Sequence, residues 1–295
     1  MDFVNCEGWL TELDDMWPGK ALSIQVEKEI CHLRSPFQDI RLFETTDCGK
    51  MLVLDGMIQF TEYDEFAYQE MMTHVPMFSH PAPEKVLVIG GGDGGILREL
   101  AKHDTVKEID ICEIDEEVIN VCREHVPSLA CGFDDPRVNI HIADGSEFIK
   151  SHNSYYDVII VDSSDPIGPG EALFHKAFYA GMKQALNDGG IIASQGESFF
   201  LHPEVFCNLL GVVRSLFPIC GYSFMLVPTY PGGNIGVCLG SLKHKVNSPA
   251  RRPSAEQQSK FNYYTPELHQ ASAVLPAFGQ RLIDKVMAAD PNSFN

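Results

Sequence analysis

Residues 85–100 read KVLVIGGGDGGILREL, an apolar stretch that runs into a glycine-rich turn and then into helix-forming residues. The run KVLVIGGG predicts a buried strand, and ILRELAKH (96–103) predicts the helix after it. Glycines at the strand end let the backbone turn sharply and approach a ligand, and the helix start offers free N–H groups. The turn therefore indicates a nucleoside-bearing ligand, but alone it does not distinguish NAD from S-adenosyl compounds.

Alternating strands and helices continue on the C-terminal side of this unit. Strands are predicted at 107–115, 137–145, 156–164 and 189–197, helices at 116–125 and 171–186, and a terminal antiparallel pair at 222–231 and 234–241. Short apolar strands alternating with helices are typical of a doubly wound, mostly parallel α/β sheet of the Rossmann-like kind. The polar segment 245–260 is interpreted as a surface loop.

The N-terminal part of the chain has a different pattern. Short alternating segments over residues 21–62, broken by Pro36, Gly49 and Asp55-Gly56, predict hairpins of an antiparallel sheet. Near Asp64 the apolar period becomes helical. We therefore expect two domains, a β-hairpin domain over residues 1–65 and a Rossmann-like catalytic domain over 66–295.

Composition narrows the possible partners. The 295 residues include 41 Asp or Glu and 22 Lys or Arg, giving a formal charge of −19, which disfavours nucleic acid and anionic membranes. Nine cysteines without a CxxC pair argue against a disulfide framework and a zinc ribbon. The start MDFVNCEGWL lacks the pattern of a secretory signal, and no apolar run reaches the ~20 residues of a membrane span. We expect a cytoplasmic protein.

Acidic residues stand where the predicted parallel strands end, which is where such sheets bind ligands. Asp93 lies inside the glycine turn, where a carboxylate would oppose a pyrophosphate, so it favours a cationic ligand; otherwise it caps the next helix. Glu113 has the spacing of a ribose-binding acid, with Asp115 as its competitor. Asp144 begins an Asp-Gly pair that serves either as a simple turn or as a ligand contact.

The fourth parallel strand ends on Asp162, and Asp165 follows three residues later in a Pro- and Gly-rich loop typical of a flap. Carboxylates here could hold ammonium groups, and one could accept a proton from an amine. No His or Cys lies close by, so we expect no metal site. An acidic crevice beside a nucleoside site predicts a cationic nucleoside and a cationic co-substrate.

These motifs resemble those of the polyamine aminopropyltransferase family. The resemblance rests on GKMLVLDGMIQFTEYDEFAYQEMMTH (49–74), VLVIGGGDGGILRE (86–99), CEID (112–115), VDSSDPIGPGEALF (161–174) and PTYPGGNIG (228–236). It implies a small β-domain before a Rossmann-like domain, usually in a homodimer. It also implies transfer of an aminopropyl group from decarboxylated S-adenosylmethionine to putrescine, with release of 5′-methylthioadenosine.

The resemblance assigns roles to individual residues. Donor contacts are implied for Gln38, Gly90, Gly91, Gly92, Asp93, Glu113, Asp144 and Gly145. Putrescine contacts are implied for Tyr68, Gln69, Asp162, Ser163, Asp165, Gln195 and Tyr230, with Asp162 as the base. Within these sets, Glu113 would hold the ribose, Asp144 with Gly145 the adenine, and Asp93 the amine of the aminopropyl arm.

The chemistry fits this assignment. Decarboxylation leaves a donor arm that carries an ammonium, which Asp93 would attract, whereas it would repel the carboxylate of ordinary S-adenosylmethionine. The sulfonium leaves as a neutral thioether, so we expect direct displacement without cofactor or metal. An Asp with the ordinary pKa of ~3.9 is a weak base for an alkylammonium, so ordering and desolvation of the amine should matter as well.

Other functions stay open. The acceptor could be spermidine or cadaverine, or the enzyme could be a putrescine N-methyltransferase that uses the undecarboxylated donor. A catalytically dead paralogue with a binding or regulatory role is the alternative outside enzymology, and Asp93 disfavours a nicotinamide-dependent dehydrogenase.

Overall fold

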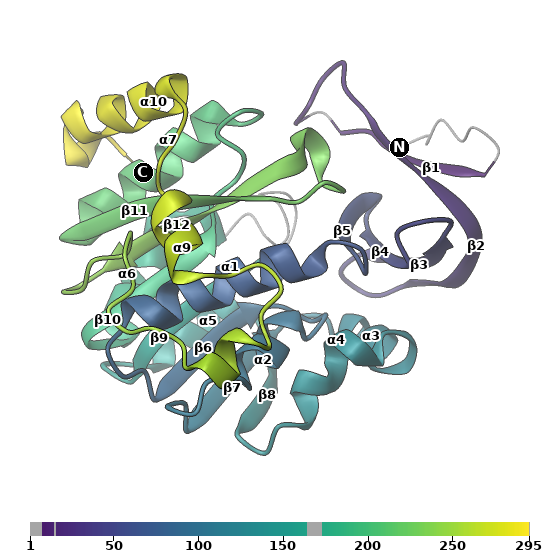
Figure 1. Cartoon of the computed structure of the whole chain (residues 1–295), viewed down its shortest axis with the longest axis horizontal. Helices are drawn as coiled ribbons and strands as arrows, with labels where there is room; N and C mark the ends of the chain where they lie inside the picture. Colours follow the sequence, from purple (N-terminus) through teal and green to yellow (C-terminus); the bar gives the residue numbers. More distant parts are fainter. Residues whose placement is uncertain (1–7, 15, 164–172, 295) are drawn as a thin grey trace.

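The computed structural model describes residues 8–14, 16–163 and 173–294, which form two β-sheets with helices packed around the larger one (Figure 1). The N-terminal sheet is antiparallel and has the order β1-β2-β3-β4-β5. Its strands are β1 (Trp9–Glu12), β2 (Leu22–Arg34), β3 (Asp39–Thr45), β4 (Lys50–Leu54) and β5 (Met57–Thr61). The predicted Asp55-Gly56 turn joins β4 to β5 with positive φ at both residues, as a two-residue hairpin requires.

The larger sheet has seven strands in the order β11-β12-β10-β9-β6-β7-β8. They are β6 (Lys85–Gly90), β7 (Glu108–Glu113), β8 (Val138–Ile142), β9 (Tyr156–Asp162), β10 (Leu186–Gln195), β11 (Ile219–Leu226) and β12 (Asn234–Ser241). Strands β6 to β10 are parallel, whereas β12 and β11 add an antiparallel pair at one edge. This arrangement confirms the predicted doubly wound fold and the N-terminal β-sheet. The chain order reverses between β6 and β9, where such sheets form their ligand crevice.

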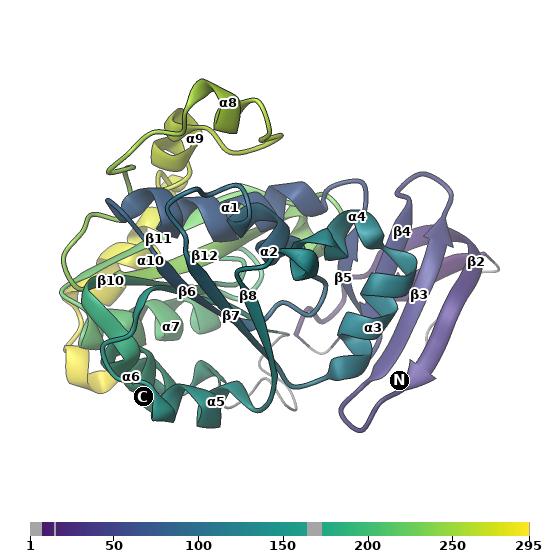
Figure 2. The same cartoon turned by 90° about the horizontal axis from the view of Figure 1, so that it is seen from below.

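Helices cover both faces of the larger sheet (Figure 2). One face carries α1 (Glu65–Ser79), α2 (Gly95–Leu100), α3 (Glu116–His125) and α4 (Pro127–Ala130), and the other α5 (Gly145–Phe148), α6 (Lys176–Ala185) and α7 (Pro203–Leu216). Alternate side chains of β6 serve the two faces: Val86 and Val88 pack in the core with α1, whereas Leu87 and Ile89 pack in the core with α6 and α7. Short 3-10 helices in the described chain include Cys131–Asp134, Ile149–Ser151, Pro231–Gly233 and Pro291–Ser293.

Helix α1 begins after Asp64, where the sequence predicts a helical period, and it is buried on every side from Ala67 to Ser79. It lies along the larger sheet with its N-terminal end toward the N-terminal sheet (Figure 1). Its carboxylate Glu70 accepts hydrogen bonds of 2.7–2.8 Å from three consecutive backbone N–H groups, those of residues 262–264. The C-terminal arm, residues 242–294, is thereby attached to α1.

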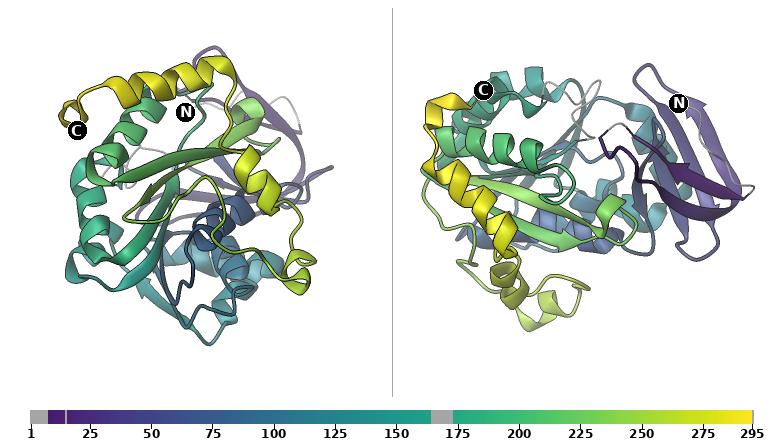
Figure 3. Two further views of the ribbon diagram at one scale, coloured as in Figure 1. Left: turned by 60° about the vertical axis from the view of Figure 1, so that its left-hand side comes forward. Right: turned by 90° about the horizontal axis from the view of Figure 1, so that it is seen from above.

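The C-terminal arm contains α8 (Ala255–Gln258), α9 (Pro266–Ala271) and α10 (Ala277–Ala288). Helix α10 packs on α7 and extends along the side of the molecule away from the N-terminal sheet (Figure 3). The predicted loop 245–260 does contain a helical turn, α8, because Ser254 and Gln257 form a capping box. Within the described part of the chain, no helix has the length and apolar character needed to cross a bilayer.

Several boundaries differ from the prediction: the strand expected at 222–231 is β11, which ends at Leu226, and the helix expected at 96–103 ends at Leu100. The helix expected at 171–186 begins at Lys176 in its described part, because His175 has an extended backbone. Strand β10 starts at Leu186 rather than 189, since a bulge with Gly189 in the left-handed region lets the chain pass directly from α6 into the sheet. The sequence does not predict β1, α7, α9 or α10.

Candidate active site

A cleft opens at the carboxyl ends of β6, β7 and β9, and strands of the N-terminal sheet form its opposite wall. On the sheet side it is lined by Gly90, Gly91, Gly92, Asp93, Glu113, Asp144, Gly145, Asp162, Ser163 and Gln195. The N-terminal side contributes Gln38, Leu52, Leu54, Ile58 and Gln59. The structure thus brings most of the predicted site residues to one cavity. Asp165 and most of the predicted flap lie outside the described residues.

The glycine turn is held directly against the end of β9. Gly90 pairs with Asp162 in the parallel register, and the Gly91 N–H donates to the Asp162 carbonyl at 3.0 Å. A Cβ on Gly90 would lie 2.0 Å from that carbonyl oxygen, and φ is +78°, so only glycine fits. This close approach places Asp93 and Asp162 in one cavity.

Asp93 both interacts with the following helix and faces the cleft. Its Oδ1 accepts from the Gly95 N–H at 2.6 Å and its Oδ2 from Gln69 Nε2 at 3.0 Å. Burial raises the pKa of Asp93 despite these hydrogen bonds. Gln69 does not line the cleft; its buried side chain lies behind Asp93 against Gly95. Its observed contact is therefore with Asp93.

Asp162 is paired with Tyr68. The hydroxyl of Tyr68, delivered by α1, donates to Asp162 Oδ1 at 2.6 Å. Burial, together with the negative charges of Asp93 and Glu113, raises the pKa of Asp162 to about 7, although the Tyr68 hydrogen bond opposes the shift. The carboxylate is therefore a much stronger base than an Asp of ordinary pKa.

A second aromatic side chain lies beside Tyr68. The ring of Tyr230 is 5.9 Å from that of Tyr68 in an edge-on arrangement. The Tyr230 hydroxyl donates to the carbonyl of Gln59 at 2.6 Å, which ties the segment before β12 to the N-terminal sheet.

Glu113, and not Asp115, lines the cleft. Burial raises the pKa of Glu113 to about 7, although it accepts the Asp115 N–H at 2.9 Å. Asp115 caps α3 and accepts from Gln38 Nε2 at 2.8 Å and from Ser35 Oγ at 2.6 Å. Asp115 therefore connects the two sheets. Asp144 caps α5 through the Ser146 N–H at 2.7 Å and also lines the cleft, and its contact with a ligand stays a prediction.

Sequence reasoning missed part of the cleft wall. Glu12, Trp17, Glu197 and His202 also line it, and all four are buried. Glu197 stands two residues after the end of β10, so its place beside a strand end was the available signal. The other three lie in segments for which no motif was assigned.

The charged side chains described in the lining of the cleft are acidic. Among its described lining residues, six are carboxylates, namely Glu12, Asp93, Glu113, Asp144, Asp162 and Glu197, and none is Lys or Arg. Three of these have raised pKa values for which burial is the leading cause. Such a site attracts cations and strengthens its carboxylates as proton acceptors.

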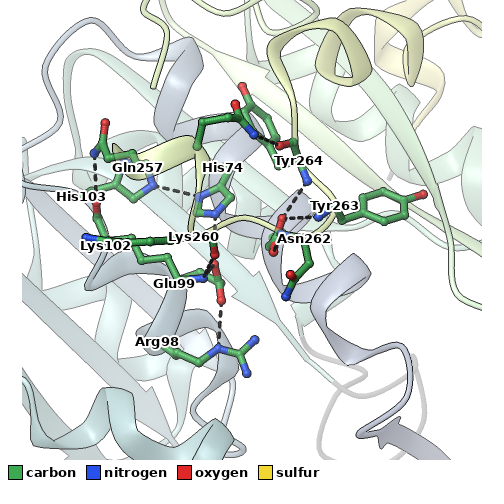
Figure 4. Close-up of polar contacts among 12 residues, drawn as sticks. His74, Arg98, Glu99, Lys102, His103, Gln257, Lys260, Asn262, Tyr263 and Tyr264 are labelled. Carbon is green, nitrogen blue, oxygen red and sulfur yellow. Dashed lines mark hydrogen bonds and ion pairs between the residues drawn. The ribbon is translucent and has the colours of Figure 1, made fainter. Parts of the chain in front are cut away.

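A network of charged and polar side chains joins α1, α2 and the segment around residues 257–264 (Figure 4). Arg98 of α2 donates two 2.8 Å hydrogen bonds to Glu65 of α1. Glu99 is fully buried and contacts Arg98 at 2.9 Å, His74 at 3.1 Å and Lys102 at 2.6 Å. Although burial opposes ionisation, these partners hold the pKa of Glu99 at about 2. Ionised Glu99 thus locks α1 and α2 together next to the glycine turn.

Comparison with known proteins agrees with this geometry. The family model described as "Spermine/spermidine synthase domain" matches residues 65–249, and the one described as "Spermidine synthase tetramerisation domain" matches residues 8–62. A spermidine synthase of Dictyostelium discoideum is 47% identical over 277 residues, covering 94% of this chain and 98% of that protein. One of Schizosaccharomyces pombe is 45% identical over 286 residues, covering 96% of each.

Solved structures are similar over nearly the whole chain. A spermidine synthase in complex with the transition-state analogue AdoDATO superimposes with a TM-score of 0.88 at 37% identity, covering 95% of this chain and 96% of that one. The spermidine synthase of Thermotoga maritima gives a TM-score of 0.86 at 36% identity with the same coverage.

Proposed function

The chain belongs to the spermidine synthase family of aminopropyltransferases, and from this premise we propose that its cleft transfers the aminopropyl group of decarboxylated S-adenosylmethionine to putrescine, forming spermidine. The observation that carries the proposal is the cleft wall, where carboxylates gather at the switch point of the sheet without a Lys or Arg among the described lining residues. Both substrates are cations, so this wall favours both.

The donor is assigned to the side of the cleft formed by the ends of β6 and β7. Glu113 at the end of β7 would accept hydrogen bonds from the ribose hydroxyls, and Asp144 with Gly145 would contact the adenine. Asp93 would bind the ammonium of the aminopropyl arm, and Gln69, which donates to Asp93, would hold that carboxylate in place. Gln38 would meet the donor from the N-terminal sheet.

The acceptor is assigned to the side with Tyr68, Asp162, Ser163, Gln195 and Tyr230. Asp162 would take the proton from the attacking amine, and its raised pKa suits that task. The amine nitrogen then forms a bond to the methylene carbon beside the sulfonium as the carbon–sulfur bond breaks. The electron pair of that bond stays on sulfur, so 5′-methylthioadenosine leaves as a neutral thioether and needs no proton.

Buried acids extend this acceptor side of the cleft. Glu12 and Glu197, with Trp17, line the cavity beyond the residues predicted from the sequence. We assign them to the far end of the diamine, whose second ammonium must also lose water on binding. Asp165, which lies outside the described residues, stays a predicted acceptor contact.

The test is a product assay. Purified protein is incubated with putrescine and either decarboxylated or ordinary S-adenosylmethionine, and products are separated by chromatography. We expect spermidine and methylthioadenosine from the decarboxylated donor only, and unchanged turnover after prior dialysis against EDTA. A methylated product would instead indicate an N-methyltransferase, and no product would contradict the proposal. Spermidine and cadaverine as acceptors separate the remaining aminopropyltransferase activities.

Self-association is proposed as well. The model matching residues 8–62 is described as a tetramerisation domain, which supports assembly through the N-terminal sheet, with a homodimer as our prediction. Sedimentation equilibrium would distinguish monomer, dimer and tetramer.

The free cysteines of the described chain support a reducing, cytoplasmic location, which imaging of the tagged protein in cells would test.

A further inference from the structure

We propose that His202 is a positioning residue that aims the carboxylate of Glu197 at the far ammonium of the acceptor, so that the enzyme prefers diamines to monoamines. The inference rests on the function proposed above. It arises from a strained backbone and a half-paired buried carboxylate at the wall of the cleft.

The backbone of Glu197 is held in an unusual conformation. Its φ is +56°, in the left-handed region that non-glycine residues rarely adopt. The preceding Gly196 N–H donates to the Gly236 carbonyl at 2.7 Å, and the Tyr222 hydroxyl donates to the carbonyl of Glu197 at 2.5 Å. Such strain persists where the surroundings enforce it, and it is concentrated at functional sites. The direction of this side chain is therefore set by its anchors.

The carboxylate of Glu197 is only half paired. Its Oε2 lies 2.8 Å from Nδ1 of His202, whereas its Oε1 is buried without a hydrogen-bond partner among the described residues. Glu197 is 2% exposed and lines the cleft. A buried carboxylate oxygen without a partner is unfavourable, so the site is suited to a ligand that brings a donor. The far ammonium of a diamine is such a donor.

His202 is itself fixed by its place in the fold. It precedes α7, its N–H donates to the Ser198 carbonyl at 2.8 Å, and its carbonyl accepts from Phe206 at 2.9 Å. The chain thus folds back after Glu197, and this turn places the imidazole of His202 beside the Glu197 carboxylate. The ring also lies 5.9 Å from that of Trp17. To bond an ionised carboxylate, Nδ1 must carry the hydrogen, and this bond directs the other oxygen of Glu197 away from His202.

The experiment compares putrescine with n-butylamine, which has the same carbon chain but only one nitrogen. We expect His202→Leu to raise KM for putrescine about tenfold or more, the effect of losing one charge-assisted hydrogen bond, with kcat within about threefold. For n-butylamine, kcat/KM stays unchanged. His202→Asn restores KM for putrescine, because its amide nitrogen takes the place of Nδ1. His152→Gln, a histidine outside the cleft, is the matched control.

A double-mutant cycle with Glu197→Gln supplies a second measurement that does not need the leucine variant. His202→Phe, which cannot bond the carboxylate, should raise KM for putrescine in the wild-type background; if His202 acts through Glu197, adding it to Glu197→Gln changes KM no further. The proposal is overturned if substitution of His202 lowers kcat/KM equally for both amines, if Asn fails to restore what Leu removes, or if the effects of the two positions simply add. Absence of spermidine with the wild-type enzyme would instead contradict the proposed function, so the two failures are distinguishable.

Discussion

Replacing Asp162 by Asn should abolish most activity and yet make the free enzyme more stable at alkaline pH. The pKa of Asp162 is raised from an ordinary ~3.9 to about 7, so the folded protein binds this proton more tightly than the unfolded chain does. For a carboxylate shifted in this direction, stability falls as pH rises from about 4 through about 7. Asn carries no charge and escapes this loss, while its side-chain oxygen still accepts from the Tyr68 hydroxyl.

The magnitude follows from the size of the shift. About three pKa units correspond to ~4 kcal/mol at most. The carboxylate is only half-buried and solvent screens it, so we expect about 2 kcal/mol, which includes relief of the repulsion with Asp93. The Asn variant should therefore exceed wild type by about 2 kcal/mol in unfolding free energy at pH 8 and show no difference at pH 4.

The assay combines urea unfolding at both pH values with steady-state kinetics. We expect kcat to fall by at least ~100-fold, the usual effect of removing a positioned base. Asp188→Asn serves as the control, because Asp188 is 94% exposed. Equal stability changes at both pH values would refute the electrostatic reasoning, and a near-normal kcat would remove the catalytic role.

Three other substitutions test the surroundings. Tyr68→Phe removes a hydrogen bond that lowers the pKa of Asp162, so the acidic limb of the kcat/KM profile should move to higher pH; a shift to lower pH would contradict this. Asp93→Asn removes a charge that raises that pKa, so the limb should move to lower pH, and product chromatography should show weaker discrimination against ordinary S-adenosylmethionine. Glu70→Ala leaves three backbone N–H groups without their acceptor and should lower the unfolding free energy by about 3 kcal/mol in urea titrations; a loss below about 1 kcal/mol would show that water replaces it.

The strand-end rule explains why the sequence was informative about the site. Asp162 ends one apolar strand and Asp93 lies in the turn after its neighbour, and parallel strands bring their carboxyl ends to one edge, so their approach was predictable. The rule could not decide whether Glu113 or Asp115 faces the cleft. Which one faces the cleft depends on the cap of α3 and on the loop before β3, which are tertiary features.

Three other features of the structure could not be predicted from the sequence near them. The left-handed turn at Glu197 is imposed by Tyr222 and Gly236, which come from later strands, and not by a glycine at the position itself. Helix α1 is buried all round, so its sequence lacks the polar face that makes a helix easy to delimit. The start of β10 depends on a bulge, which the periodicity of side chains does not reveal.

Helix α1 has a consequence for how enzymes of this family could be recombined. Its consecutive residues Tyr68, Gln69 and Glu70 contact Asp162, Asp93 and the C-terminal arm in turn. Because successive helical residues point ~100° apart, one residue inserted or deleted between Glu65 and Tyr68 would redirect all three side chains at once. The first turns of the helix are thus intolerant of length changes, and a chimaera of two relatives should be joined in the turn at residues 62–64 rather than within 65–70.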